Sequence, residues 1–250
     1  MQLQKIREIL PSFGNSASIN MTRCDVLKLL PTFCPNYVKN GQPYYSRPID
    51  HAILIYSFHM KRSYYFAKLI MKLAEVILAK ADKIVNDTSV IQIDDTIYFN
   101  FDAFVFSCKG VLESNLYKRL SDNIDKQLKP DFDNFAAKAK AAFIDPLLTI
   151  LRNEIIHVNY GGSGGYFNTA LIETNSDGKN IRIYSNFRRN DIPVDLLELF
   201  SEVLTNMDSI SEGMTKFISK DIYLRFGTPS STKFISDNGK IIIPELTGIA

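Results

Sequence analysis

The sequence contains few of the residues from which disulfide frameworks and clustered metal sites are built. Its 250 residues include three cysteines, three histidines and no tryptophan. Cys24, Cys34 and Cys108 form no CxxC pair and are odd in number, which argues against a disulfide framework and against a cysteine-rich zinc site. HExxH and the glycine fingerprint of dinucleotide-binding folds are absent, so the chain carries no signature of those two enzyme classes.

Long hydrophobic runs and a strong charge of one sign are also missing. Nowhere do 18 apolar residues follow one another, and the first residues, MQLQKIREIL, lack the apolar run of a signal peptide. We therefore expect no membrane span and a cytoplasmic protein. Lys and Arg number 29 against 27 acidic residues, so a surface for nucleic acid has to be local. With 46% apolar and 22% charged residues, the composition is that of a folded globular chain.

Hydrophobic periodicity of the helical type is the strongest pattern present. Ile49 to Val85 is the clearest segment, because apolar residues recur at spacings of three and four without glycine or proline. Further helices are predicted from about Asp102 to Leu128, from about Asp131 to Ile156, and from Ile192 to about Ile218. Pro146 is expected to kink or divide the third of these. The predicted buried side of the second helix is Phe104, Val105, Cys108, Val111, Leu112, Leu116 and Leu120. The predicted core stripe of the last helix is Leu196, Leu199, Phe200, Val203, Leu204, Met207, Ile210 and Met214. The predicted buried stripe of the first helix is Phe66, Leu69, Ile70, Leu73, Val76, Ile77, Ile84 and Val85.

Two β-hairpins are predicted after the third helix. Thr169–Thr174 and Ile181–Asn186 flank the turn sequence Asn175-Ser176-Asp177-Gly178-Lys179, which is a strong hairpin signal. Lys233–Ser236 and Lys240–Ile243 similarly surround Asp237-Asn238-Gly239. Both hairpins are predicted as appendages to a helical bundle.

Residues 1–48 are predicted to form a peripheral lead-in. A short helix from Gln4 to Leu10 is expected to end at Pro11, and Thr22 is expected to cap a helix over Arg23–Leu30. Four prolines then keep the segment mostly extended.

The expected fold class is mainly α. The organisation is a bundle of about four main helices over residues 49–218, with a hairpin at about 169–186 and a C-terminal tail with a small hairpin over 219–250. Val90–Asp95 is either a brief strand or an extended loop.

Lysines recur along the first long helix. Lys61, Lys68, Lys72 and Lys83 fall on or near one face, mostly four or seven residues apart. This pattern is either an ordinary solvated face or a stripe that attracts phosphate groups.

Groups suited to chemistry come closest together at Arg152-Asn153-Glu154-Ile155-Ile156-His157, which is followed by Tyr160 and by the glycine run at 161–165. The planar guanidinium of arginine is suited to holding a phosphate. Histidine takes and gives a proton near neutral pH. Together the two side chains provide the parts for RNA cleavage without a metal: a base or acid for the proton and a cation for the charge on the phosphate.

This motif resembles the signature of the HEPN superfamily, in which an arginine precedes a histidine by four to six residues, often with a polar residue directly after the arginine. The resemblance implies an all-helical bundle with Arg152 and His157 as catalytic residues and Asn153 as a supporting residue. It also implies a homodimer in which two motifs form one composite cleft. In a subgroup paired with nucleotidyltransferase antitoxins, a tyrosine lies two positions after the histidine; here Asn159 holds that position and Tyr160 follows it.

The functional hypothesis is a metal-independent endoribonuclease acting on RNA in a toxin–antitoxin or phage-defence system, with no cofactor. An antitoxin or a nucleotidyltransferase is an expected partner. The alternative is a non-catalytic HEPN-like module that binds RNA, a nucleotide or a protein, and a third hypothesis is a purely structural dimerisation domain. In that last case Arg152 would cap the helix C-terminus and His157 would pack at its end.

Helix geometry limits how the motif can work. Positions five apart on an ideal helix point about 140° away from each other. Arg152 and His157 therefore converge only if the helix ends or distorts near Ile156, or if a second subunit completes the site. Glu154 either orients Arg152 or is an exposed helical carboxylate.

Other candidate residues give weaker signals. His51 and His59 have no acidic cluster nearby and make a poor metal site. Asp94, Asp95 and Asp102 would either bind a metal, pair with Arg152, or act as loop and N-cap residues. The glycine run lacks the Lys-Ser/Thr ending of a P-loop, so it is either an anion-binding nest or a flexible hinge.

Overall fold

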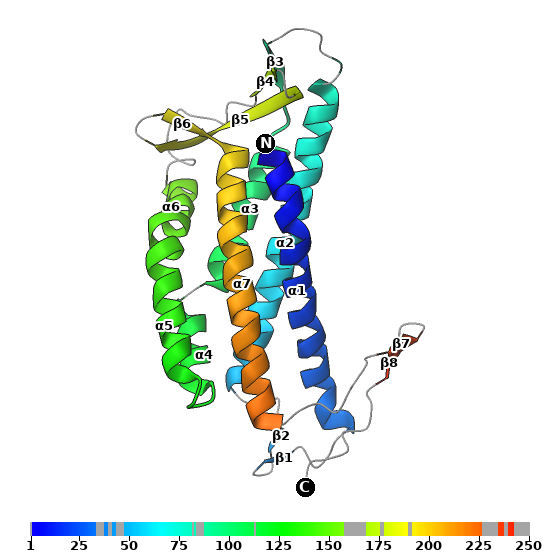
Figure 1. The fold of residues 1–250 in the computed structure, drawn as a ribbon, viewed down its shortest axis with the longest axis vertical. Helices are drawn as coiled ribbons and strands as arrows, with labels where there is room; N and C mark the ends of the chain where they lie inside the picture. Colours follow the sequence, from blue (N-terminus) through cyan, green and yellow to red (C-terminus); the bar gives the residue numbers. More distant parts are fainter. Residues whose placement is uncertain are drawn as a thin grey trace.

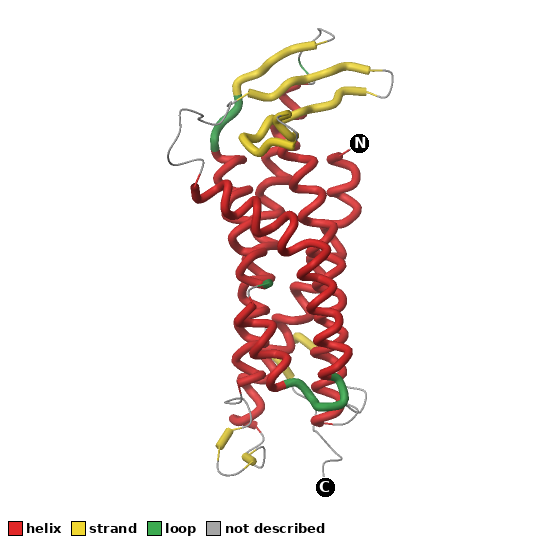
Figure 2. Tube along the Cα trace, turned by 90° about the vertical axis from the view of Figure 1, so that its left-hand side faces the viewer, coloured by secondary structure: helices red, strands yellow, loops and turns green. Residues whose placement is uncertain are grey.

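The fold is mainly helical, with a small antiparallel sheet across one end of an elongated bundle (Figures 1 and 2). The N-terminus lies at the sheet end of the bundle (Figure 1). The computed structural model describes residues 2–33, 38–39, 42–43, 48–81, 83, 88–112, 114–157, 169–175, 178–189, 192–226, 235–237 and 240–242.

Helix α1, Gln2–Phe33, packs along both α2, Pro48–Ala81, and α7, Leu196–Phe226. The predicted helix end at Pro11 is wrong, because α1 continues through this residue. A proline inside a helix costs about 3 kcal/mol. Ile6 and Phe13, on either side of it, are fully buried in the common core, and their burial offsets that cost.

The structure thus places the first helix inside the bundle, where a peripheral lead-in had been expected. Gly14 brings the two helices close together, since a Cβ atom at this position would lie 2.6 Å from the ring of Tyr64 on α2. The helix expected over Arg23–Leu30 is part of the same continuous α1.

The predicted first long helix is confirmed as α2. Its buried face differs in part from the predicted stripe: Ile70 and Ile77 are buried, but Val76 is exposed. Ile84 and Val85 lie outside the described residues. The buried residues of α2 include Ala52, Ile53, Tyr56, Met60, Ala67, Ile70, Met71, Ala74, Ile77 and Ala81.

The predicted second helix consists of two helices, α3, Thr96–Val111, and α4, Ser114–Asn123. The chain leaves the helical conformation at Leu112, whose φ is −107° and ψ is 11°. The residues predicted to be buried here are all buried: Phe104, Val105, Cys108, Val111, Leu112, Leu116 and Leu120. Burial also raises the pKa of the Cys108 thiol well above its ordinary range, so this cysteine is an inert core residue.

The predicted third helix is interrupted near Pro146, as expected. Helix α5, Lys129–Ala139, begins with Pro130 in its first turn and is followed by a π-helix, η2, Lys140–Leu148, which contains Pro146. Helix α6, Thr149–His157, follows without a loop.

The π-helix also explains which face of α6 is buried. Residues spaced four apart drift by about 40° per step around a regular α-helix. The wider π turns oppose this drift, which keeps one such row buried: Phe143, Leu147, Leu151 and Ile155.

Strands β3, Thr88–Gln92, β4, Thr169–Asn175, β5, Gly178–Arg189, and β6, Ile192–Asp195, form one antiparallel sheet in this order. The predicted hairpin is confirmed, with Asn175 opposite Gly178 at its turn. The prediction that the last long helix starts at Ile192 is wrong.

Ile192–Asp195 pairs with β5 and α7 begins only at Leu196, after Pro193 and the capping residue Asp195. The predicted core stripe of this helix is buried throughout: Leu196, Leu199, Phe200, Val203, Leu204, Met207, Ile210 and Met214.

The sheet is fixed to the bundle by its apolar face and by two hydrogen bonds. Ala170, Ile172, Ile181 and Ile183 are buried on that face. Lys179 Nζ donates to Ala81 O at 2.9 Å, at the C-terminus of α2, where a cation is favourable. The Tyr98 hydroxyl of α3 donates to Tyr184 O at 3.1 Å.

Two short hairpins complete the described chain. One pairs β1, Val38–Lys39, with β2, Gln42–Pro43. The other pairs β7, Ile235–Asp237, with β8, Lys240–Ile242, which confirms the predicted C-terminal hairpin. None of the helices in the described ranges has the length and apolar character needed to cross a membrane.

Candidate functional site

The Arg–His motif lies on α6, at the end of the bundle that carries the sheet (Figure 1). The described backbone stays helical up to His157. The side chains of Glu154 and His157, and the whole of Tyr160, lie outside the described residues, as does the glycine run at 161–165. The predicted roles of these residues therefore stay predictions.

Arg152 lies at the border between the core and the solvent. Its neighbours Leu151 and Ile155 are buried, whereas Arg152 is half-buried and Asn153 is exposed. The Nη1 atom of Arg152 donates a hydrogen bond to Asn153 Oδ1 at 3.2 Å. Among the described carboxylates none forms an ion pair with Arg152, so its charge is not neutralised by them.

The regular helix separates the two ends of the motif. Over the five residues from Arg152 to His157 the helix rises about 7.5 Å and turns their Cα atoms about 140° apart. The distortion near Ile156 that would let them converge is absent from the described backbone. A second subunit is therefore the simpler way to bring an arginine and a histidine together.

Two exposed apolar side chains lie near the contact between α3 and α6. Lys109 Nζ of α3 donates to Thr149 Oγ1 of α6 at 2.9 Å, which joins the two helices. Phe106 precedes this lysine by one turn and Ile150 directly follows Thr149, and both side chains are exposed.

The acidic candidates do not gather around the motif. Asp94 accepts hydrogen bonds from the backbone N–H and the hydroxyl of Thr96, and these bonds hold the pKa of its carboxyl below the usual value. Asp94 therefore has the loop role: it lies directly before Asp95, the N-cap residue of α3, whose side chain makes no capping hydrogen bond. In the part of the chain that the structure describes, no group of three or more His, Cys, Asp or Glu residues could hold a metal ion.

His59 occupies a packing position. Its ring lies so close to Gly110 that a Cβ atom there would be 2.6 Å from His59 Nδ1. Its backbone carbonyl accepts a hydrogen bond from Ser63 Oγ at 2.9 Å. These contacts favour a packing role for His59 over metal binding. The side chain of His51 lies outside the described residues.

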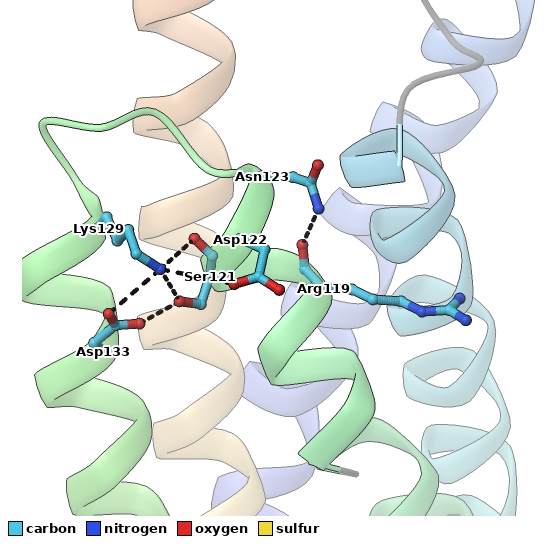
Figure 3. Close-up of polar contacts among 6 residues, drawn as sticks. All are labelled: Arg119, Ser121, Asp122, Asn123, Lys129 and Asp133. Carbon is cyan, nitrogen blue, oxygen red and sulfur yellow. Dashed lines mark hydrogen bonds and ion pairs between the residues drawn. The ribbon is translucent and has the colours of Figure 1, made fainter.

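A polar cluster joins α4 to α5 (Figure 3). Lys129 Nζ donates to Ser121 O at 2.9 Å and to Ser121 Oγ at 2.6 Å, and it lies 3.6 Å from Asp133 Oδ2 and 4.0 Å from Asp122 Oδ1. Ser121 Oγ donates to Asp133 Oδ1 at 2.5 Å. Because the lysine is already surrounded by acceptors, the cluster is suited to fixing the turn between two helices.

Asp195 was not among the predicted site residues, although an aspartate directly before the apolar-periodic Leu196 is a helix-start signal. Its Oδ1 atom accepts hydrogen bonds from Leu197 N at 2.9 Å and from Ile183 N at 3.3 Å, so one carboxyl caps α7 and holds β5. Burial raises the pKa of Asp195 from 3.8 to about 6, although these two bonds oppose the rise.

Replacing Asp195 by asparagine is expected to stabilise the protein above pH 6. Because the folded-state pKa is raised, the protonated carboxyl favours folding at low pH, and this contribution is lost as the pH rises through about 6. Asparagine can accept the same hydrogen bonds without carrying a charge. The rise in pKa from 3.8 to about 6, at about 1.36 kcal/mol per pKa unit, limits the gain in free energy of unfolding to about 3 kcal/mol. Urea unfolding at about pH 7.5 and about pH 4 should show a gain that shrinks with falling pH.

Asp94→Asn is the matched control, because Asp94 also accepts a backbone hydrogen bond at the start of a helix, but its pKa is lowered. Its ionised form favours folding, so this variant should lose stability at neutral pH, and the loss should vanish as the pH falls through the lowered pKa. Equal, pH-independent changes in both variants would contradict the assignment for Asp195.

Comparisons of the chain with protein-family models, with curated proteins and with solved structures gave no match.

Proposed function

We propose that the chain is a HEPN-like, metal-independent endoribonuclease. Three features support this: the mainly helical bundle, the position of the motif on a helix that ends near the sheet, and the polar partner of the arginine. The observation that supports the proposal most directly is the Arg152–Asn153 hydrogen bond, because a supporting residue is expected to contact the arginine.

In this mechanism Arg152 holds the scissile phosphate and His157 moves the proton. The 2′-oxygen of the ribose forms a bond to phosphorus while the bond from phosphorus to the 5′-oxygen breaks. A neutral imidazole accepts the 2′-hydroxyl proton, or an imidazolium donates a proton to the leaving 5′-oxygen. The guanidinium stabilises the charge that builds on the phosphate oxygens. The products are a 2′,3′-cyclic phosphate and a 5′-hydroxyl.

A homodimer is part of the proposal. The Cα atoms of Arg152 and His157 lie about 140° apart around α6, and we infer that a second copy brings one residue of each kind together. In a symmetric pair of chains, Arg152 of one copy would work with His157 of the other. The two α6 helices would then face each other and form one composite cleft.

The biological setting follows from the resemblance alone. We propose a cytoplasmic toxin–antitoxin or phage-defence role in which an antitoxin or a nucleotidyltransferase controls the enzyme. Tyr160 is one residue later than the modified tyrosine of the subgroup paired with nucleotidyltransferases. Modification of Tyr160 is therefore not included in the proposal.

RNA cleavage in the presence of EDTA tests the function. Because no step uses a metal, a chelator is expected to leave the cleavage rate unchanged within about twofold, and the 5′ fragments should end in 2′,3′-cyclic phosphate. The products can be identified by mass spectrometry of a short labelled RNA. Complete loss of cleavage with EDTA and recovery with a divalent ion would contradict the mechanism. Binding of RNA without cleavage would favour a non-catalytic module.

A further inference from the structure

The outer face of α2 combines cations with exposed aromatic rings. Between Ala52 and Ala81 the exposed positions of this helix recur along one side. We call six of them the basic stripe: Phe58, Lys61, Arg62, Tyr65, Lys68 and Lys72. At a rise of 1.5 Å per residue the stripe is about 21 Å long.

The aromatic rings of the stripe are unusually open to solvent. Phe58 is 61% exposed and Tyr65 is 58% exposed. They are seven residues apart, which places them about two turns apart on the same side of the helix. A lone exposed aromatic is ordinary, but two aligned rings between cations form a repeated pattern.

The cations of the stripe keep their charge available. None of the four pairs with a carboxylate within the described ranges, and the nearby Glu75 is paired with Arg7 of α1 at 3.1 Å. Two of them lie beside aromatic faces of the same helix: Arg62 Cζ is 5.7 Å from the ring centre of Phe66, and Lys68 Nζ is 5.6 Å from that of Tyr64. The net charge of the whole chain is only +2, so this positive face is a local concentration.

We propose that the basic stripe binds single-stranded RNA. The four cations would contact successive phosphates, and unpaired bases would stack on Phe58 and Tyr65. Surfaces for single strands combine these two elements, a positive track for the backbone and aromatic platforms for the bases. The inside of a duplex offers no free base faces, so exposed rings favour a single strand.

The composition of the stripe favours RNA over a membrane surface. A helix that lies in a bilayer interface has a broad apolar face opposite its basic face. In α2 the opposite face is packed against α1 and α3, and the outer face mixes two rings with four cations. Anionic vesicles are therefore the comparison ligand in the test.

The stripe lies apart from the motif, because α3 packs against both α2 and α6. It would act as a docking surface that holds the strand while another part of the RNA reaches Arg152. The inference deepens the proposed function by naming where the substrate binds, but binding by the stripe does not require cleavage.

The test measures binding of a fluorescent single-stranded oligonucleotide made of 2′-O-methyl nucleotides, which cannot be cleaved through the 2′-oxygen. Fluorescence anisotropy with EDTA, at several salt concentrations, compares wild type with Lys68→Gln/Lys72→Gln. Losing two phosphate contacts should lower the slope of log K against log salt by about 1.4 and weaken binding about tenfold at about 0.15 M salt. Tyr65→Ala should weaken binding at least about fivefold with an unchanged salt slope.

Lys216→Gln/Lys220→Gln is the matched control. These two exposed lysines on α7 have the same spacing of four, and the change in charge is the same. This variant is expected to bind like wild type. Circular dichroism of all variants checks that the helices are intact.

The outcomes separate the inference from the proposed function. Weaker binding in the stripe variants alone supports the inference, even if no RNA is ever cleaved. Cleavage by wild type together with equal binding by both double variants overturns the inference and leaves the enzyme proposal standing. Absence of oligonucleotide binding, or tighter binding to phosphatidylserine vesicles that depends on the stripe, also overturns it.

Discussion

Replacing His157 by alanine is expected to lower RNA cleavage by about 100-fold to 10,000-fold, the range that a general acid or base usually contributes. Arg152→Ala should cost about 100-fold to 1,000-fold, because it removes a donor aimed at the charge on the phosphate. Single-turnover cleavage of a short labelled RNA measures both losses. Arg182→Ala is the control: Arg182 is an exposed arginine on β5 that pairs with Glu173 at 3.2 Å, so cleavage should stay unchanged.

Mixing the two inactive variants tests the composite cleft. If Arg152 of one subunit works with His157 of the other, a heterodimer of Arg152→Ala and His157→Ala contains one intact pair. Exchange of subunits should then restore part of the cleavage. Confirmed subunit exchange without any recovery would show that both groups must come from one chain, which the helical spacing within α6 disfavours.

The chemistry of the motif could be read from the sequence because it depends on residue types and spacing. Arg152 and Asn153 were predicted to act together, and the structure joins them by a hydrogen bond. Whether Arg152 and His157 meet depends on the tertiary structure and, in the proposed dimer, on a second subunit. Spacing along one helix cannot supply that information.

The core of α7 was predictable for a similar reason. Its apolar residues follow the helical period, and the period alone identifies a buried face. At Pro11 the prediction from local sequence failed. The burial of Ile6 and Phe13 by other helices outweighs the energetic cost of a proline inside a helix. At Ile192–Asp195 the prediction failed because pairing with a distant strand decides the conformation.

Two properties can be derived only from the tertiary structure: the raised pKa of Asp195 and the solvent exposure of the basic stripe. The lysine spacing in the sequence left two alternatives, an ordinary solvated face and a phosphate-binding stripe. Only the exposure of Phe58 and Tyr65 beside those cations favours the second. Likewise an N-capping aspartate is visible in the sequence, but the desolvation of its carboxyl is a consequence of the sheet packed around it.

The largest effect on stability is expected for Phe104→Ala. Phe104 on α3 and Phe200 on α7 are both fully buried, and their rings meet edge to face with centres 5.1 Å apart. The substitution leaves a cavity between two helices of the bundle and should lower the free energy of unfolding by about 3–5 kcal/mol. In a chain of this length the melting temperature should fall by about 10 °C. Thermal unfolding followed by circular dichroism measures the shift.

Phe99→Ala provides the matched comparison on the same helix, because Phe99 is 60% exposed and the same atoms are removed. It should change the free energy of unfolding by no more than about 0.5 kcal/mol, as is usual for surface substitutions. Equal losses in the two variants would contradict the assignment of Phe104 to the core. The same melting measurement serves as a reference for the site variants. His157→Ala should lose cleavage but should not show the fall in melting temperature expected for Phe104→Ala, because losing a catalytic group need not destabilise the bundle.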